Sequence, residues 1–333
     1  MKRVVITGGA GFIGSHYAHH AHRSHPDWTI LVLDKLTYAG NPANLTDLEG
    51  QPRFAFMRGD IASRKDVDAA FEGGVDYLLN FAAETHVDRS IGDPEGFLRT
   101  DIYGAYTLLE AARRHGVGRF VQISTDEVYG SVPGGSSRED AALRPSNPYS
   151  ASKAAADRLA YSYFVTYGLP VLVTRASNNF GPRQYPEKLI PLFITNALDD
   201  LPLPLYGDGA QIRDWLHVAD HCVALDVVLE RGEPGETYNI GGGNERRNIE
   251  ITWRILDRLR KPRSLVRPVA DRPGHDRRYS VDCGRLRGLG WSPAAPFERA
   301  LDETVDWYAA NPGWWRPIKS GEYLEYYRTQ YRL

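Results

Sequence analysis

The 333-residue chain has only two cysteines, almost no net charge and a short apolar run at its start. Cys222 and Cys283 show no paired C-x-x-C spacing, so they favour neither a disulfide framework nor a cysteine zinc site. The 40 basic and 42 acidic residues give a net charge of −2, which excludes nucleic-acid or membrane-surface binding driven by bulk charge. The initial apolar run is too short for a membrane span and leads into a glycine turn. We therefore expect a cytoplasmic protein that holds any phosphate locally.

Short β-branched runs alternate with longer helix-like segments through the first half of the chain. This rhythm predicts a parallel sheet covered by helices on both faces. Two segments, from Gly104 to His115 and from Tyr149 to Tyr167, carry apolar residues at helical spacing and predict helices with one apolar face. The expected strands are Arg3 to Thr7, Thr29 to Leu33, Arg53 to Phe56, Tyr77 to Phe81, Phe120 to Ser124 and Val171 to Ala176.

The pattern changes after Arg175, where prolines interrupt it, and Leu216 to Arg231 again resembles a helix. A chain of this length favours two domains, although one remains possible. The predicted fold class is α/β, with a Rossmann-type doubly wound parallel sheet and a smaller C-terminal α/β substrate domain. The aromatic end, from Trp307 to Tyr331, favours a packed terminal helix and its cover over a ligand cage. The expected domains are 1–176 with a returning segment at 211–238, and 177–210 together with 239–333.

Gly8, Gly11 and Gly14 lie between the first expected strand and the helix after it. Glycines there allow a tight turn, and the N–H groups at the helix start can face a diphosphate. Such a turn can also serve only to pack a helix on a strand. Asp34, at the end of the second strand, favours the nucleotide site because a carboxylate there can accept hydrogen bonds from a ribose diol. The carboxylate would repel a 2′-phosphate, so NAD is favoured over NADP. Lys35 is the one neighbouring cation that could attract a 2′-phosphate and so favour NADP.

Tyr149 and Lys153 lie four residues apart and share one face of an expected helix. The pair can be no more than an exposed helix face. It also has a chemical use: a phenol has a pKa of about 10, and an adjacent ammonium and the nicotinamide charge both lower that pKa. The tyrosine can then deprotonate a substrate hydroxyl as hydride leaves for NAD. The dinucleotide site upstream favours this chemical interpretation.

Two motifs, TGGAGFIG at 7–14 and YSASK at 149–153, resemble the extended short-chain dehydrogenase/reductase family. Between them, STDEVYG at 124–130 resembles the signature of the sugar-nucleotide 4,6-dehydratases; the epimerases of the same superfamily lack its Asp-Glu pair. The resemblance runs through nearly the entire chain. Its other stretches are AAETHVDRS at 82–90, NNFGPRQYPEKLIP at 178–191, YGDGAQIRDWLHVADH at 206–221, YNIGGGNE at 238–245 and DRPGHDRRY at 271–279.

The resemblance implies NAD-dependent conversion of dTDP-glucose to dTDP-4-keto-6-deoxyglucose. A ketone made at C4 acidifies the C5–H, water is lost across C5 and C6, and hydride returns to C6. By resemblance Glu127 is the C5 base, Asp126 the acid at O6, and Thr125 bonds the sugar near O4. Two nearby carboxylates tend to have separated pKa values, and the sequence leaves open which of them keeps its proton. A UDP-sugar 4,6-dehydratase or a 4-epimerase is the alternative, and a silent NAD-binding regulator is disfavoured by the complete catalytic set.

The resemblance also assigns binding residues one by one. A sugar diphosphate carries about two negative charges, and Arg272 is expected to meet its phosphate, although a lone arginine is more often solvated. Asp60 can bond the adenine edge, but it can equally cap a turn. The expected cofactor residues are Gly8, Gly11, Phe12, Ile13, Gly14, Asp34, Lys35, Leu36, Thr37, Asp60, Ile61, Phe81, Ala82, Ala83, Thr85, Thr100, Tyr149, Lys153 and Asn179. The expected substrate residues are Thr85, Thr125, Asp126, Glu127, Asn178, Lys188, Leu189, Pro204, Tyr206, Arg213, Asn248, Arg272 and His275.

Three positions depart from the family pattern: Thr85 replaces the common Ser, Asp101 the usual Asn, and Phe180 the usual Tyr. Asp101 adds a charge near the ligand edge of the sheet and can alter local pKa values or simply cap the next helix. His217, His221 and His275 have no obvious carboxylate or thiol set around them, so we predict no metal. The resemblance implies a homodimer formed by the two helices at 104–115 and 149–167.

Overall fold

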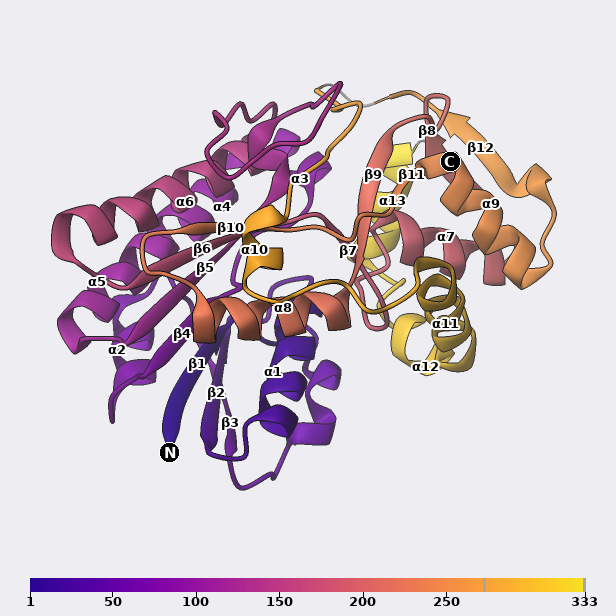
Figure 1. Cartoon of the computed structure of the whole chain (residues 1–333). Coiled ribbons are helices and arrows are strands. Elements are labelled where there is room, and N and C mark those ends of the chain that lie inside the picture. Colours follow the sequence, from indigo (N-terminus) through magenta and orange to yellow (C-terminus); the bar gives the residue numbers. More distant parts are fainter. Residues whose placement is uncertain (272–273, 332–333) are drawn as a thin grey trace.

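The computed structural model describes residues 1–271 and 274–331. Its centre is a seven-stranded sheet in the order β10-β6-β5-β4-β1-β2-β3, in which every neighbouring pair is parallel. The predicted parallel sheet is therefore confirmed (Figure 1). Its strands are β1 (Lys2–Thr7), β2 (Trp28–Asp34), β3 (Phe54–Arg58), β4 (Tyr77–Asn80), β5 (Arg119–Thr125), β6 (Val171–Ala176) and β10 (Thr237–Ile240).

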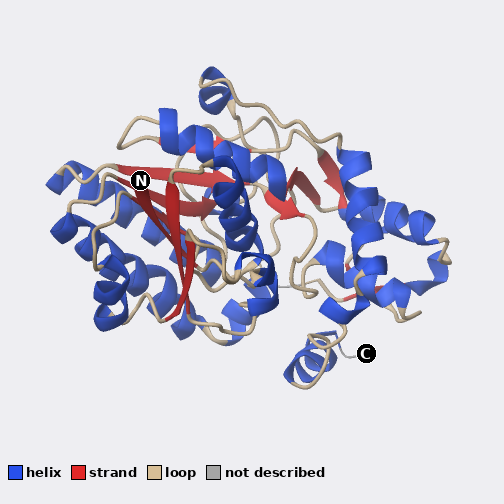
Figure 2. Cartoon of the chain, turned by 90° about the horizontal axis from the view of Figure 1, so that it is seen from below, coloured by secondary structure: helices blue, strands red, loops and turns tan. Residues whose placement is uncertain are grey.

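Helices cover both faces of this sheet (Figure 2). On one face α1 (Phe12–Ser24) and α8 (Val218–Arg231) bury apolar side chains against Val4 and Ile6. On the other, α2 (Arg64–Phe71), α5 (Ala105–His115) and α6 (Pro148–Tyr167) pack against the face that carries Val5. Successive β1 residues thus serve opposite cores, as expected for a strand buried on both sides.

The start of α6 is fixed by its sequence. The Asn147 side chain accepts a hydrogen bond from the Ser150 N–H at 2.9 Å, and the Asn147 N–H donates to the Ser150 hydroxyl at 3.3 Å. This reciprocal capping box, followed by proline at the first helical position, sets where the helix begins. Tyr149 consequently lies in the first turn, and Lys153 lies one turn further along.

The rest of the chain forms two small sheets, β11-β9-β7 and β12-β8, with helices around a third apolar core. Their strands are β7 (Asn178–Phe180), β8 (Leu203–Tyr206), β9 (Ile212–His217), β11 (Glu245–Arg247) and β12 (Val266–Val269). The helices are α7 (Leu189–Leu198), α9 (Asn248–Leu259), α11 (Phe297–Ala310), α12 (Pro312–Trp315) and α13 (Glu322–Tyr331). The shorter elements are η1 (Pro42–Asn44), η2 (Thr46–Leu48), α3 (Val87–Gly92), α4 (Pro94–Phe97), η3 (Leu98–Gly104), η4 (Asp126–Tyr129), η5 (Arg263–Leu265) and α10 (Gly284–Gly288).

Two details refine the expected organisation. The segment returning to the large sheet includes α8 and β10, whereas β9 pairs with β7 and β11 in a small sheet. The exact domain boundaries stay a prediction. The packed terminal helix and its cover, expected between Trp307 and Tyr331, consist of the end of α11, which stops at Ala310, and of α12 and α13, because Pro312 begins a new helix. Over the described ranges, the helices are all too short or too polar to span a membrane.

Candidate active site

A cavity opens at the carboxyl ends of the parallel strands, where ligands bind in open α/β sheets. It brings together the turn between β1 and α1, the ends of β2 and β4, the turn after β5 and the start of α6. All of the expected cofactor residues line it except Leu36. The Leu36 N–H instead donates to Asp34 Oδ1 at 2.7 Å, so Leu36 orients a lining residue without lining the cavity itself.

The turn between β1 and α1 needs its glycines. A Cβ on Gly14 would lie 2.4 Å from the Gly8 oxygen, and a Cβ on Gly8, where φ is +68°, would lie 2.5 Å from the Ala82 nitrogen. Among the described residues no side chain caps the start of α1, and its first turn carries no acidic residue. The N–H groups there are consequently available to an anion, and this donor set fits a dinucleotide diphosphate.

Charges at the ends of β2 and β3 suit a ribose diol better than a phosphate. Asp34 accepts hydrogen bonds from the Ala10 N–H at 2.9 Å and from the Leu36 N–H, and it is almost fully buried. The Lys35 ammonium forms an ion pair with Asp60 at 2.9 Å. Burial raises the pKa of Asp60, but the bond from Lys35, the bond from the Ala62 N–H and the nearby positive charges together outweigh it, and the net shift is downward. Because Lys35 is already paired, it does not offset the repulsion between Asp34 and a 2′-phosphate.

Tyr149 and Lys153 both face this cavity, as predicted from their spacing. The Lys153 ammonium is buried and donates to the Ile123 carbonyl at 2.7 Å. The pKa of Tyr149 is raised by loss of water around its hydroxyl and by the charges of Glu127, Asp101 and Asp126. The expected lowering by Lys153 is therefore outweighed within the chain itself. The carboxylates responsible come from two other segments, which the helical spacing does not reveal.

Asp126 and Glu127 follow β5 in the short helical turn η4. The Thr125 hydroxyl donates to Asp126 Oδ1 at 3.2 Å and accepts from the Glu127 N–H at 3.3 Å, so one side chain sets the geometry of both acids. Asp126 is 2% exposed, and its Oδ2 has no hydrogen-bond partner among the described residues. Burial, Glu127 and Asp214 all raise the pKa of Asp126. The direction of this shift favours the protonated form of Asp126.

A buried ion pair between Arg175 and Asp157 stabilises the turn η4. The Arg175 guanidinium donates to Asp157 at 2.7 and 3.1 Å and to the Tyr129 hydroxyl at 2.7 Å. The Tyr129 hydroxyl in turn donates to Asn239 Oδ1 at 2.8 Å. Asp157 lies on α6, one turn beyond Lys153. The network therefore fixes η4, which carries the acid pair, relative to α6, which carries Tyr149 and Lys153.

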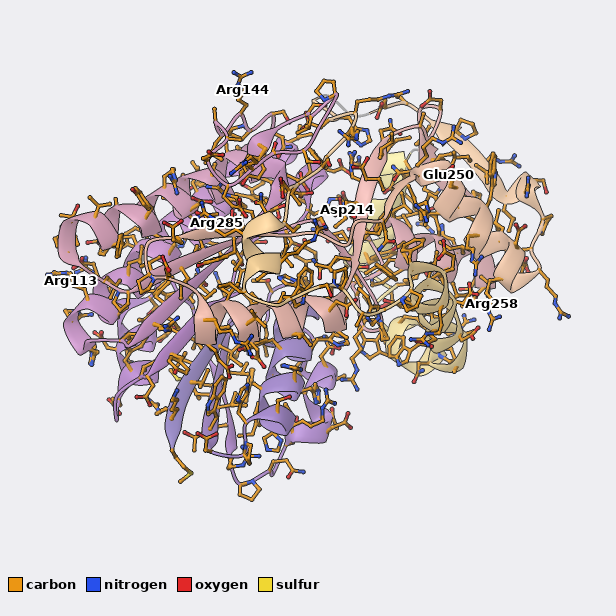
Figure 3. The ribbon with its side chains drawn as sticks, viewed as in Figure 1. Arg113, Arg144, Asp214, Glu250, Arg258 and Arg285 are labelled. Carbon is orange, nitrogen blue, oxygen red and sulfur yellow. The ribbon has the colours of Figure 1, made fainter. Side chains whose placement is uncertain are left out.

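A second cavity lies beside the first and shares Glu127, Asn178 and Lys188 with it. The other expected substrate residues that line it are Leu189, Pro204, Tyr206, Arg213, Asn248 and His275. Thr85, Thr125 and Asp126 line the first cavity. Arg272 lies outside the described residues. Asp214 directly follows Arg213 in the sequence and therefore marks this region in Figure 3, where it lies at the centre of the view between the large sheet and α9.

Two cations of the second cavity are held in place by backbone carbonyls. The Lys188 ammonium donates to the Thr85 carbonyl at 2.5 Å. The Arg213 guanidinium donates to the Asp276 carbonyl at 2.9 Å and lies 4.2 Å from the centre of the Tyr279 ring. Their positive charge at the junction of the cavities suits a diphosphate.

Several lining residues were not assigned to the site from the sequence, among them Glu187, His221 and Tyr331. Glu187 lies in the stretch that carried the resemblance and could have been found there. His221 lies in the stretch 206–221, which also carried the resemblance, whereas Tyr331 had no local signal, because α13 reaches the second cavity only through tertiary packing. Among the departures, Phe180 is fully buried and packs on Trp215 and other rings, so its missing hydroxyl leaves no gap in the site.

Residues 5–304 match the family model described as GDP-mannose 4,6 dehydratase. The chain belongs to this family. It is 52% identical over 322 residues to the dTDP-glucose 4,6-dehydratase of Streptomyces antibioticus, covering 95% of each chain. The expected kinship with the nucleotide-sugar dehydratases is confirmed.

Solved structures show the same kinship. The dTDP-glucose 4,6-dehydratase DesIV of Streptomyces venezuelae, with NAD and TYD bound, is 51% identical and superposes with a TM-score of 0.93, over 95% of this chain and 100% of that chain. The UDP-glucose 4-epimerase of Thermus thermophilus, in complex with NAD, is 32% identical with a TM-score of 0.86, over 92% of this chain and 99% of that chain. The fold is thus common to dehydratases and epimerases, while the sequence is more similar to the dehydratase.

Proposed function

We propose that this protein binds NAD and dehydrates dTDP-glucose to dTDP-4-keto-6-deoxyglucose. The observation that carries the proposal is that Asp126 and Glu127 face the same cavity as Tyr149 and Lys153. A 4-epimerase needs only the redox pair, because it returns hydride to the carbon that lost it. Relatives that are 52% and 51% identical and bear the dehydratase name support the same assignment.

Bound NAD would take hydride from C4 and give it back at C6. Tyr149 accepts the proton of the 4-hydroxyl during oxidation. Its pKa is raised in the chain alone, so the cationic nicotinamide is needed beside it to favour the phenolate. Lys153, fixed by its bond to the Ile123 carbonyl, supplies a second positive charge on the same side. Oxidation is accordingly expected only when cofactor and substrate are both in place.

The acid pair performs the elimination. Glu127 removes the C5 proton, which the C4 ketone has made acidic, and Asp126 donates its proton to O6 as the C5–C6 double bond forms and water leaves. Asp126 suits the second role because burial keeps it protonated and its Oδ2 has no other partner among the described residues. Thr125 orients both carboxyl groups and bonds the sugar near O4. Glu127 returns its proton to C5 as hydride adds at C6, and proton exchange with solvent restores Tyr149 and Asp126 for the next cycle.

The second cavity takes the nucleotide diphosphate. Lys188 and Arg213 lie where the cavities meet, so they neutralise the two phosphates, with Arg272 as a further phosphate contact. Leu189, Pro204, Tyr206, Asn248 and His275 surround the rest of the nucleotide. The sugar then lies toward Thr125, and the nicotinamide toward Asn179 in the first cavity.

Parallel assays with dTDP-glucose and UDP-glucose test this substrate. A single thymine methyl contributes about 1–3 kcal/mol of discrimination in an apolar pocket, so both sugars can react at different rates. We expect a 4-keto-6-deoxy product and a higher kcat/KM with dTDP-glucose. A galactose-configured product would indicate an epimerase, and binding of both ligands without any keto product would indicate a silent regulator.

We also infer a homodimer formed through α5 and α6. Large apolar side chains stay exposed along η3 and α6, and such a patch marks a contact surface. They are Leu98, Tyr103, Tyr161, Val165 and Tyr167. Val165→Glu should yield a monomer in sedimentation analysis, whereas Val223→Glu, on the exposed side of α8, should leave the dimer intact. A monomeric native chain would contradict this inference.

The domain division and the compartment complete the proposal. We keep 1–176 with 211–238 as the cofactor domain, and 177–210 with 239–333 as the substrate domain. Cys222 and Cys283 are both free and buried, which suits a reducing compartment such as the cytoplasm.

A further inference from the structure

Asp101 is a buried carboxyl group beside Tyr149 and Lys153 to which the proposed chemistry assigns no role. It lies in η3, a single π-helical turn, and is 2% exposed. Such turns inside helices frequently occur at functional sites. The side chain does not cap the helix that follows, since α5 begins at Ala105 and no described side chain caps it. The capping interpretation of Asp101 is therefore wrong, and its side chain faces α6 instead.

The hydrogen bonds of Asp101 suit both of its protonation states. Oδ1 accepts from the Glu84 N–H at 2.9 Å, and Oδ2 accepts from the Ser152 hydroxyl at 2.6 Å. The same Ser152 hydroxyl lies 2.8 Å from the Tyr149 carbonyl oxygen. When Asp101 is protonated, it can donate to Ser152, and Ser152 can then donate to the Tyr149 carbonyl. Asp101 can consequently gain or lose a proton without any side chain moving.

Few charged or titratable groups lie near Asp101. The elements packed against η3 are α4, α5 and α6, and the buried residues of α4 and α5 are uncharged. From α6 the site receives Lys153 and Tyr149, and the loop after β4 contributes Glu84. Beyond these, Lys35, Arg89 and Asp93 act on Glu84, and Asp157 acts on Lys153. The ionisable groups on which Asp101 acts are thus Glu84 and the two residues of the redox pair.

The direction of each influence follows from charge. Burial raises the pKa of Asp101 to about 6, with Lys153 opposing the rise. Ionised Asp101 in turn adds to the raised pKa of Tyr149, and it partly offsets the lowering of the Lys153 pKa by burial. Asp157 also supports the charge on Lys153, so Lys153 keeps one nearby carboxylate when the Asp101 charge is lost.

We propose that Asp101 is a positioning residue for alcohol oxidation, whose negative charge opposes proton loss from Tyr149 and whose protonation relieves that opposition. This inference rests on the proposed function, in which Tyr149 takes the proton of the 4-hydroxyl. The consequence is that oxidation remains possible at lower pH than it would with a permanent charge at this position.

Asp101→Asn tests the proposal by locking the neutral state. Asparagine has the same shape as aspartate, so the variant is expected to fold. The matched control is Asp93→Asn, which neutralises an exposed acid just before α4. The rate of nicotinamide reduction in the first turnover is measured against pH. In Asp101→Asn the acidic limb of this pH–rate profile should move to lower pH by about one unit, a tenfold change in the ionisation constant of Tyr149. The control should follow the native profile. A limb that stays in place or moves to higher pH would overturn the proposal.

The thermal midpoint of the cofactor-free protein supplies a readout that needs no turnover. The folded pKa of Asp101, about 6, lies above its ordinary value of 3.8. Its ionisation therefore costs stability as pH rises through that window. The thermal midpoint of Asp101→Asn should rise relative to the native midpoint between pH 3.8 and 6, and the difference should stay constant at higher pH. A pH-independent difference would overturn the proposal. Should the native protein never reduce its nicotinamide, the proposed function fails, and this readout still decides whether Asp101 titrates as inferred.

Discussion

Asp126→Asn removes the proposed acid and leaves the shape of the site in place. The Thr125 hydroxyl donates to Asp126 Oδ1 at 3.2 Å, and an amide oxygen can accept the same bond. Oδ2, buried without a partner among the described residues, becomes an NH₂ group that cannot release a proton to O6. Burial and the charges of Glu127 and Asp214 raise the pKa of Asp126, so the native protein loses stability as pH rises through that folded pKa. The variant lacks this loss and should be at least as stable near neutrality.

The expected effect falls on elimination alone. A positioned general acid contributes about 10²–10⁴-fold to a proton-transfer step. This range corresponds to about 3–5 kcal/mol of barrier, enough to stall the cycle after oxidation. Oxidation itself depends on Tyr149 and needs no proton at O6. In rapid-mixing absorbance, reduced nicotinamide should therefore form at close to the native rate and then persist.

Proton exchange at C5 separates the two carboxyl groups. In deuterated water, Asp126→Asn keeps the base Glu127 and should exchange the C5 proton of the bound ketone, whereas Glu127→Gln should not. Nuclear magnetic resonance of recovered substrate measures this exchange. Native turnover in Asp126→Asn, or equal exchange in the two variants, would refute the division of roles.

Three further substitutions test other parts of the site. Arg175→Met removes the buried partner of Asp157, which keeps only its pair with Arg158 at 2.9 Å, and should lower the free energy of unfolding by about 1.5–3 kcal/mol in urea titration; a loss near zero would show that the Arg175 ion pair does not hold the turn. Gly14→Ala should abolish NAD binding in calorimetry, because its Cβ would lie 2.4 Å from the Gly8 oxygen, and native affinity would contradict the predicted diphosphate contact. Tyr149→Phe should prevent the first appearance of reduced nicotinamide, and normal formation would exclude it as the base.

The large sheet and its helices could be predicted because their signals are local. β-Branched runs marked six of the seven strands, and the apolar spacing of 104–115 and 149–167 marked α5 and α6. The cofactor turn was also marked locally, by glycines between a strand and a helix, although the contact that requires Gly8 is with Ala82, which follows β4. The strand β10 was not marked, because it joins the sheet from a distant part of the chain.

The electrostatics of the site could not be predicted in the same way. The spacing of Tyr149 and Lys153 suggested a lowered tyrosine pKa, but the direction depends on Asp101, Asp126 and Glu127, which tertiary packing brings beside Tyr149. Which acid keeps its proton depends likewise on the burial of Asp126. Tyr331 reaches the second cavity from the last helix, and no motif near it indicated a role.

The central claim is that the cofactor is reduced only temporarily, with hydride leaving C4 and returning to C6 of the same sugar. The most direct measurement uses dTDP-glucose deuterated at C4, with the position of the label in the product read by nuclear magnetic resonance. The account predicts deuterium at C6 and no net accumulation of reduced nicotinamide. Deuterium retained at C4, or reduced nicotinamide formed in proportion to product, would contradict it.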